Sequence, residues 1–213
     1  MRHRIVDRTL AAVVVLATAL SFAAAPGIAG AQTRKPEGSL VSTALPQAKQ
    51  TTLGLYVTAA QAYAMWQADP VKVKIIDVRT PEEFAFVGHP AMAWNVPIAF
   101  VTYQRKEGKF TYAPKMNAEF VDLVREIAQP SDTLLVTCRS GGRSAMGVNA
   151  LAKAGFTHVY NIVDGVEGDT VDDPESVFHG KRMKNGWKNS APWVYDIDPE
   201  KVILEEGSSK QTQ

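Results

Sequence analysis

The sequence predicts one α/β domain built on a parallel sheet with helices on both faces. Its 213 residues are 46% hydrophobic and 21% charged, which is the composition of an ordinary globular domain with a sizeable core. From residue 53 onward, short apolar segments alternate with segments of helical spacing. One apolar segment, Thr133–Thr137, is hydrophobic without alternation, which is typical of a strand buried on both faces.

Residues 1–31 are predicted to be a signal peptide. A basic start with Arg2 and Arg4 precedes the apolar run 10–25, and Pro26 follows it. Ala29-Gly30-Ala31 supplies the small side chains that a signal peptidase requires, so we expect the mature chain to begin at Gln32. The apolar run is shorter than the roughly 20 residues that span a bilayer. We therefore predict an exported, periplasmic protein without stable membrane insertion after cleavage; an uncleaved anchor is the alternative.

The domain itself is predicted to span residues 53–198. Residues 32–52 are rich in Thr, Gln, Ser, Lys and Pro without an apolar period, which predicts a flexible lead. The first cycle of the fold then has an apolar segment at 55–57, a helix from Thr58 through Trp66, and a strand at 71–77.

A second cycle begins at Thr80. The run Thr80-Pro81-Glu82-Glu83 places a cap, a proline at the first helical position and a glutamate three residues after the cap, which predicts a short helix that ends at Gly88. A strand at 94–96 and a loop through Gly108 follow.

The pattern repeats in the second half. Asn117 is expected to cap a helix over residues 120–127, after which come the strand Thr133–Thr137, a helix at 143–154 and a strand at 158–163. Residues 165–198 have no clear period and predict an extended loop region packed on the domain, with a C-terminal tail at 199–213.

Charge and cysteine content exclude several classes of function. The 23 basic and 22 acidic residues give a net charge of +1 without runs of one sign, so no nucleic acid partner is expected. The single cysteine, Cys138, excludes an internal disulfide and an all-cysteine metal cage, and the four histidines show no ligand spacing. We expect no metal.

The segment around Cys138 has the features of an anion site. It passes from a buried strand directly into a helix, where open α/β sheets bind their ligands. Gly141 and Gly142 let successive N–H groups point inward, and the helix N-terminus, Arg139 and Arg143 add positive charge. These features favour a thiolate, so Cys138 is predicted to be a nucleophile. The alternative is a cysteine that only packs in the core.

The sequence resembles the rhodanese (sulfurtransferase) family over roughly residues 53–193. The resemblance rests on residues 75–84, on Gly88-His89, on the run 95–97 and on the cysteine loop 138–143. It implies the rhodanese-like parallel sheet, with Cys138 as the catalytic cysteine. The residues implied to cradle its sulfur and bind the substrate are Arg139, Ser140, Gly141, Gly142 and Arg143.

The resemblance also implies a reaction. In that family the cysteine takes a sulfane sulfur from a small anionic donor such as thiosulfate, becomes a persulfide, and passes the sulfur to cyanide, a thiol or a protein acceptor, without a metal or organic cofactor. Arg139 and Arg143 with the loop N–H groups are the donors available to meet the developing negative charge. Asp77 and Arg79 are assigned a supporting role at the rim of the site.

Two alternatives to a sulfurtransferase remain. A cysteine phosphatase or arsenate reductase would also hold an oxyanion over a thiolate, but those enzymes resemble a Cys-x5-Arg pattern, whereas four residues separate Cys138 from Arg143 here. A carrier that holds a persulfide for a partner without turnover is the second alternative. The chain also departs from the family pattern, with one extra residue between Glu83 and His89 and a longer, more acidic stretch after Gly165.

Overall fold

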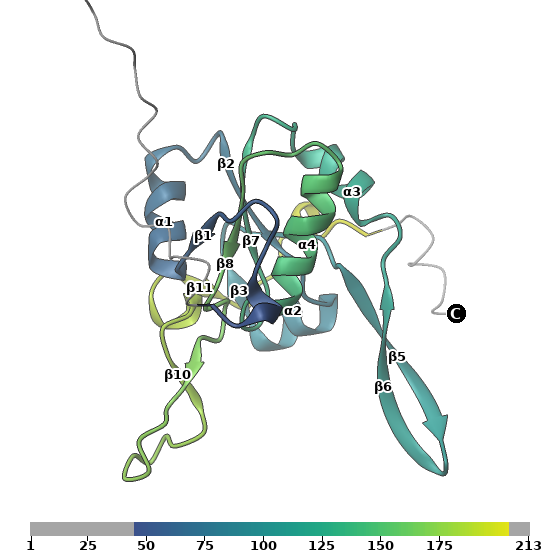
Figure 1. The fold of residues 1–213 in the computed structure, drawn as a ribbon, viewed down its shortest axis with the longest axis vertical. Coiled ribbons are helices and arrows are strands. Elements are labelled where there is room, and N and C mark those ends of the chain that lie inside the picture. The colour runs from purple at the N-terminus through teal and green to yellow at the C-terminus, as the bar shows by residue number, and fades with distance from the viewer. Residues whose placement is uncertain (1–44, 205–213) are drawn as a thin grey trace, which may run out of the picture. The chain divides into compact units, whose positions relative to one another are not determined.

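The computed structural model describes residues 45–204. Its centre is a parallel sheet in the order β1-β8-β7-β2-β4 (Figure 1). The strands are β1 (Tyr56–Val57), β8 (Val159–Ile162), β7 (Thr133–Thr137), β2 (Val73–Asp77) and β4 (Trp94–Asn95). The predicted signal peptide and residues 32–44 lie outside the described residues. Within residues 45–204, no helix has the length and apolar character needed to cross a bilayer.

Helices cover both faces of this sheet, which confirms the predicted fold class. Alternate side chains of β7 point into two separate cores, because successive residues of a strand face opposite sides. Leu134 and Val136 join the core under α3 (Phe120–Ile127) and α4 (Gly142–Lys153). Leu135 joins the core under α1 (Ala59–Ala68) and α2 (Pro81–Val87).

Of the three residues predicted to open or cap a helix, two are confirmed. The Thr58 and Thr80 hydroxyls accept the backbone N–H groups of Gln61 and Glu83, and both capping boxes are complete. The prediction at Asn117 is wrong. Its side chain accepts the N–H of Glu119, which closes a turn before α3 begins, so Asn117 stands too early in the chain to cap the helix.

The loop predicted through Gly108 is instead a β-hairpin. Strands β5 (Ala99–Lys106) and β6 (Lys109–Met116) pair antiparallel along their whole length and leave the parallel sheet (Figure 1). Glu107 and Gly108 form the two-residue connection with φ of 51° and 78°. Two positive φ angles match the twist of a tight hairpin, and glycine permits one of them without strain.

The predicted flexible lead is wrong for its last part. Residues Gln47–Lys49 form the short 3-10 helix η2, and the backbone carbonyl of Lys49 accepts the side-chain amide of Asn161 at 2.9 Å. The N–H of Thr52 donates to the side chain of Asn149 in α4 at 2.9 Å. The ordered domain therefore begins before residue 53, because these backbone groups find partners on it.

The region 165–198 packs on the domain and contains two small ribbons. Strands β9 (Asp169–Thr170) and β10 (Arg182–Lys184) pair antiparallel, and β11 (Trp193–Val194) pairs with β3 (His89–Pro90). Between them, the 3-10 helix η3 (Trp187–Asn189) buries the indole of Trp187 completely. This indole anchors the region against the core that contains α1 and α2.

The start of the predicted C-terminal tail also belongs to the domain. After the 3-10 helix η4 (Pro199–Lys201), Val202 forms a parallel bridge with Asn95, and the N–H of Ile203 donates to the carbonyl of Asn95 at 2.9 Å. These contacts cover the open edge of β4. Residues 205–213 lie outside the described residues.

Candidate active site

Cys138 lies at the carboxyl end of β7, the central strand of the sheet. Its side chain is 2% exposed and packs in the core under α3 and α4. The N–H of Gly141 donates to its sulfur at 3.2 Å, and the hydroxyl of Ser144 lies 3.4 Å from the same atom. The sulfur is therefore held between the bend of the loop and the first turn of α4.

Ser144 and Asn161 form a buried polar network beneath this sulfur. Both side chains are fully buried, and the Ser144 hydroxyl donates to the Asn161 side-chain oxygen at 2.6 Å. Because this bond uses the one hydroxyl hydrogen, the Ser144 oxygen is left to accept a hydrogen bond from the Cys138 thiol. The Asn161 amide donates to the carbonyls of Gly141 and Lys49, which fixes the loop.

Two glycines shape the backbone around Cys138. Gly141 has φ of 97°, and a side chain there would collide with the carbonyl of Val163. Gly165 has φ of 63°, and a Cβ there would lie 2.5 Å from the Cys138 carbonyl oxygen. The N–H groups of Val166 and Glu167 donate to the carbonyls of Cys138 and Arg139 at 2.8 and 3.0 Å. The active-site loop is thus bound to the segment that follows β8.

The two arginines of the loop have different surroundings. Arg143 is bound to Glu83 of α2 through two hydrogen bonds of 2.5 and 2.6 Å. Arg139 is exposed and makes no side-chain hydrogen bond or ion pair within residues 45–204. Arg143 therefore joins the loop to α2, while the charge of Arg139 is available to an anion. Of the remaining loop residues, Gly142 begins α4 and Ser140 faces a cavity described below.

The pair between Arg143 and Glu83 keeps both groups charged. The hydrogen bonds to Glu83 raise the pKa of Arg143 above its ordinary value, against the opposing effect of burial. Burial alone would raise the pKa of Glu83, but the bonds from Arg143 and Thr80 outweigh it and lower that pKa. Glu83 thus has two functions, as a partner of the α2 cap and as the anchor of the cysteine loop.

Asp77 and Arg79 form a second ion pair, which is fully buried. The two side chains are 0% exposed, and the closest nitrogen and oxygen lie 2.6 Å apart. Burial opposes the charge of Arg79, but Asp77 more than compensates, so its pKa is raised. Arg79 also donates to the carbonyl of Gly88 at 2.8 Å, and Asn95 donates to the carbonyls of Asp77 and Arg79. The pair holds β2, the end of α2 and β4 together.

His89 is buried next to this pair. Its ring stacks on Phe84 with centroids 3.6 Å apart, and its Nδ1 lies 3.1 Å from the Phe84 carbonyl. Burial lowers the pKa of His89, so the ring is neutral at neutral pH. These contacts give His89 a structural role.

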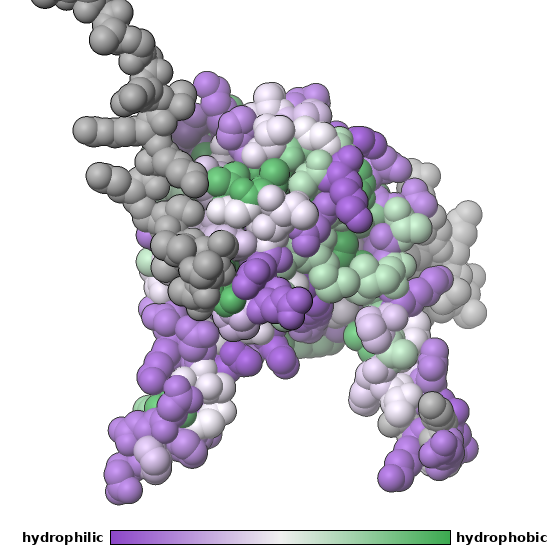
Figure 2. All heavy atoms as spheres, in the orientation of Figure 1, coloured by the Kyte–Doolittle hydropathy of each residue, from purple (hydrophilic) through white to green (hydrophobic). Residues whose placement is uncertain are grey.

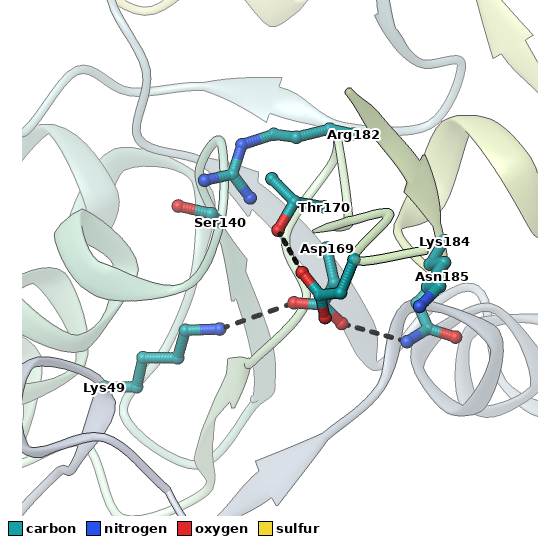
Figure 3. A pocket seen from close by; sticks show the side chains of 8 residues that line it. Lys49, Ser140, Asp169, Thr170, Arg182, Lys184 and Asn185 are labelled. Carbon is teal, nitrogen blue, oxygen red and sulfur yellow. Dashed lines mark hydrogen bonds and ion pairs between the residues drawn. The ribbon is translucent and has the colours of Figure 1, made fainter. Parts of the chain in front are cut away.

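A cavity of about 530 Å³ adjoins the cysteine loop (Figure 3). The side chain of Ser140 forms part of its wall, and Lys49 enters from η2. The opposite wall comes from the β9 and β10 ribbon, with two carboxylates near the middle of the view and Arg182 above them. The complete lining is Lys49, Ser140, Asp169, Thr170, Asp172, Arg182, Lys184 and Asn185.

Sequence reasoning found the cysteine loop but missed its support. Ser144 and Asn161 were not singled out, although Asn161 is a polar residue inside an otherwise apolar strand, which is a recognisable signal. The contact of Glu83 with Arg143 was not predicted, because the capping box already explained a glutamate at that position. The structure brings Asp77 and Arg79 together with each other, and it places Arg143 against Glu83.

The fold and the site together define a class of protein. A buried cysteine at the carboxyl end of the central parallel strand, with the Gly141 N–H at its sulfur, places the candidate site where open α/β proteins bind their ligands.

Comparison with known proteins identifies the family. Residues 58–170 match the family described as Rhodanese-like domain. An uncharacterized protein of Rickettsia prowazekii is 32% identical over 124 residues, which cover 57% of this chain and 82% of that protein. Thiosulfate sulfurtransferase 16, chloroplastic, of Arabidopsis thaliana is 39% identical over 92 residues, which cover 43% of this chain and 69% of that protein.

A solved structure agrees with this match. The crystal structure of Rv0390 from M. tuberculosis aligns with a TM-score of 0.51 at 29% identity, covering 65% of this chain and 96% of that one. The chain therefore belongs to the rhodanese-like domain family, which is a family of sulfurtransferases.

Proposed function

We propose that this protein transfers a sulfane sulfur from thiosulfate, or a similar anionic donor, to a thiophilic acceptor through a persulfide on Cys138. The observation that carries the proposal is the sulfur of Cys138 held by the Gly141 N–H at 3.2 Å inside the cysteine loop of a rhodanese-like domain. The name of the similar Arabidopsis thaliana protein, thiosulfate sulfurtransferase 16, supports thiosulfate as the donor.

The first half-reaction forms a sulfur–sulfur bond on the enzyme. The Cys138 thiol loses its proton to a base in solution, and the thiolate attacks the outer sulfur of thiosulfate. The sulfur–sulfur bond of thiosulfate breaks, and its electron pair leaves with sulfite. The Gly141 N–H at the sulfur and the exposed charge of Arg139 are the groups that stabilise the developing negative charge.

The second half-reaction returns the enzyme to its starting state. A cyanide ion or an acceptor thiolate attacks the outer sulfur of the persulfide, and a new carbon–sulfur or sulfur–sulfur bond forms. The bond to Cys138 breaks, and its electron pair returns to the Cys138 thiolate. When this thiolate takes up a proton from solvent, the resulting thiol can donate a hydrogen bond to the Ser144 hydroxyl.

The experiment is steady-state sulfur transfer from thiosulfate to cyanide by four proteins. Cys138→Ser should be inactive, because serine cannot form the persulfide. Arg139→Ala should raise the KM for thiosulfate by about tenfold, the effect of one lost charge-assisted contact. Arg125→Ala, which removes an exposed arginine of α3, is the matched control and should leave this KM unchanged. Full activity in Cys138→Ser would overturn the proposal.

A persulfide carrier without turnover is the second candidate. The single buried cysteine suits storage of one sulfur as well as its transfer. Stoichiometric loading by thiosulfate without catalytic release to cyanide or small thiols would favour the carrier.

We also propose that the protein acts outside the cytoplasm. The basis is the basic start, the apolar run and the Ala29-Gly30-Ala31 site. N-terminal sequencing of the protein from a periplasmic fraction should give Gln32 as the first residue, and recovery of Met1 would contradict export with cleavage.

A further inference from the structure

The cavity beside the cysteine loop is the strongest unassigned feature of the domain. Its volume of about 530 Å³ lies in the range of small-molecule sites. The family match ends at residue 170, so Asp172, Arg182, Lys184 and Asn185 come from the chain that follows it. One wall of this cavity therefore lies outside the matched family domain.

The cavity is coupled to Cys138 through the backbone. Ser140, in its wall, stands two residues after Cys138 and next to Gly141, whose N–H holds the sulfur. The segment that leads into β9 donates two hydrogen bonds to the carbonyls of Cys138 and Arg139. A molecule bound in this cavity therefore lies against the loop that carries the reactive sulfur.

The charges of the cavity are of both signs, and several already have partners. Lys49 donates to the Val163 carbonyl at 2.8 Å and lies 3.9 Å from Asp169 (Figure 3). The other carboxylate oxygen of Asp169 accepts the side-chain amide of Asn185 at 2.9 Å. These bonds bind η2, β9 and the end of β10 into one wall, so Asp169 is part of the framework of the cavity.

Arg182 donates to the carbonyl of Gly168 at 2.6 Å, whereas Lys184 and Asp172 remain available to a ligand. Lys184 is exposed and makes no side-chain hydrogen bond or ion pair within the described chain. Asp172 is exposed, and its carboxylate accepts only the hydroxyl of Thr170, at 3.4 Å. Hydrophilic side chains cover this end of the molecule in the space-filling view (Figure 2). The cavity thus offers one ammonium and one carboxylate to a ligand.

This charge pattern selects a class of ligand. A simple anion would meet the free carboxylate of Asp172, and a simple cation would meet the free ammonium of Lys184. Within residues 45–204, no three metal-ligating side chains lie together, so the two aspartates do not form a metal site by themselves. A molecule with an ammonium and a carboxylate close together satisfies both signs.

We propose that this cavity binds the sulfur acceptor, and that the acceptor is a small thiol with an α-amino acid head group. The inference rests on the proposed function, in which a thiol receives the outer sulfur of Cys138. Asp172 binds the ammonium of the acceptor, Lys184 binds its carboxylate, and Ser140 lies on the side that faces the cysteine loop. Free cysteine and a glutamyl peptide thiol such as glutathione share this head group.

The first test compares acceptors at a fixed thiosulfate concentration. The wild type should use L-cysteine or glutathione with a KM at least tenfold below those of mercaptoethanol, cysteamine and mercaptopropionate, which lack one or both charges. Asp172→Asn and Lys184→Gln should each raise the KM for the preferred thiol by about tenfold and leave cyanide turnover unchanged. The lower KM between L-cysteine and glutathione identifies the source of the head group.

Two variants on the same ribbon serve as matched controls. Glu175→Gln and Lys181→Gln remove exposed charges outside the cavity and should behave as the wild type with every acceptor. Equal increases in KM in these controls would show that the overall charge of the ribbon, and not contact with Asp172 and Lys184, sets the affinity for the acceptor. That result would overturn the assignment of these two residues.

A binding measurement separates this inference from the proposed function. S-methyl-L-cysteine cannot accept sulfur, so its affinity can be measured by calorimetry without turnover. It should bind the wild type about tenfold more tightly than either cavity variant, and methylthiopropionate and methylthioethylamine should bind weakly. Unchanged binding in both variants, with normal cyanide turnover, would overturn the acceptor site alone. Binding without any transfer from thiosulfate would overturn the proposed function and the acceptor role with it.

Discussion

Replacing Asp77 by asparagine tests the buried ion pair at the rim of the site. The two side chains are fully buried, and Arg79 makes contacts of 2.6 and 3.0 Å to the Asp77 carboxylate. In Asp77→Asn the guanidinium keeps its charge, because the pKa of Arg79 is far above neutral, and it loses the compensating carboxylate. Removing one partner of a buried pair costs about 3–5 kcal/mol. The variant should lose that much of a total of about 5–15 kcal/mol.

Urea unfolding followed by tryptophan fluorescence measures this loss. Trp193 reports on the region directly, because Arg79 lies 5.8 Å from the centre of its ring. The double variant Asp77→Leu with Arg79→Met should recover most of the stability, since it leaves no buried charge without a partner. A loss below about 1 kcal/mol in Asp77→Asn would refute the reasoning. If the folded Asp77→Asn variant fails to load sulfur, Asp77 takes part in the reaction and its supporting role is wrong.

Three further predictions concern the cap, the anchor of the loop and its backbone. Thr80→Ala should lower the free energy of unfolding by about 1 kcal/mol without abolishing sulfur transfer, and loss of activity at unchanged stability would contradict the capping role. Glu83→Gln should cost about 1 kcal/mol at neutral pH. The pKa of Glu83 is lowered in the folded state, so its contribution to stability is complete above the ordinary glutamate pKa and is lost as pH falls through the lowered value. The free energies of unfolding of the wild type and Glu83→Gln should therefore converge in acid. A difference that stays constant with pH would contradict the ion pair with Arg143. Gly165→Ala should destabilise the protein and slow sulfur loading, because its Cβ would collide with the cysteine loop. Gly155 also has a positive φ but open space around it, so Gly155→Ala should lower the free energy of unfolding only by the backbone strain of about 1–3 kcal/mol and should load sulfur normally.

Local patterns were sufficient to predict most of the domain. The unbroken apolar run Thr133–Thr137 predicted the bounds of β7. Thr58 predicted the start of α1, and Thr80 with a glutamate three residues later predicted the start of α2. These signals depend on neighbours in the chain, and tertiary contacts reinforce them. The cysteine loop was found for the same reason, because its residues are consecutive.

The hairpin 99–116 was missed because its local signals are weak. Val101 and Tyr103 alternate with polar residues, but Glu107-Gly108 is a less typical hairpin connection than Asn-Gly. A two-stranded ribbon also carries no core of its own, so little hydrophobic patterning marks it.

The support of the active site was missed because it is not local. Ser144 meets Asn161, and Arg143 meets Glu83 sixty positions away, only after the sheet has formed. Polar residues such as these can satisfy their hydrogen bonds in several ways, so the sequence alone does not select the partner. The contact of residues 47–49 with the domain likewise involves Asn161, so the composition of residues 47–49 alone could not predict it.

The persulfide on Cys138 is the central claim, and intact mass spectrometry of the mature protein after incubation with thiosulfate tests it most directly. The wild type should gain one sulfur atom, cyanide should remove it, and Cys138→Ser should gain none. No added sulfur on the folded wild type, or an equal gain on Cys138→Ser, would contradict the claim.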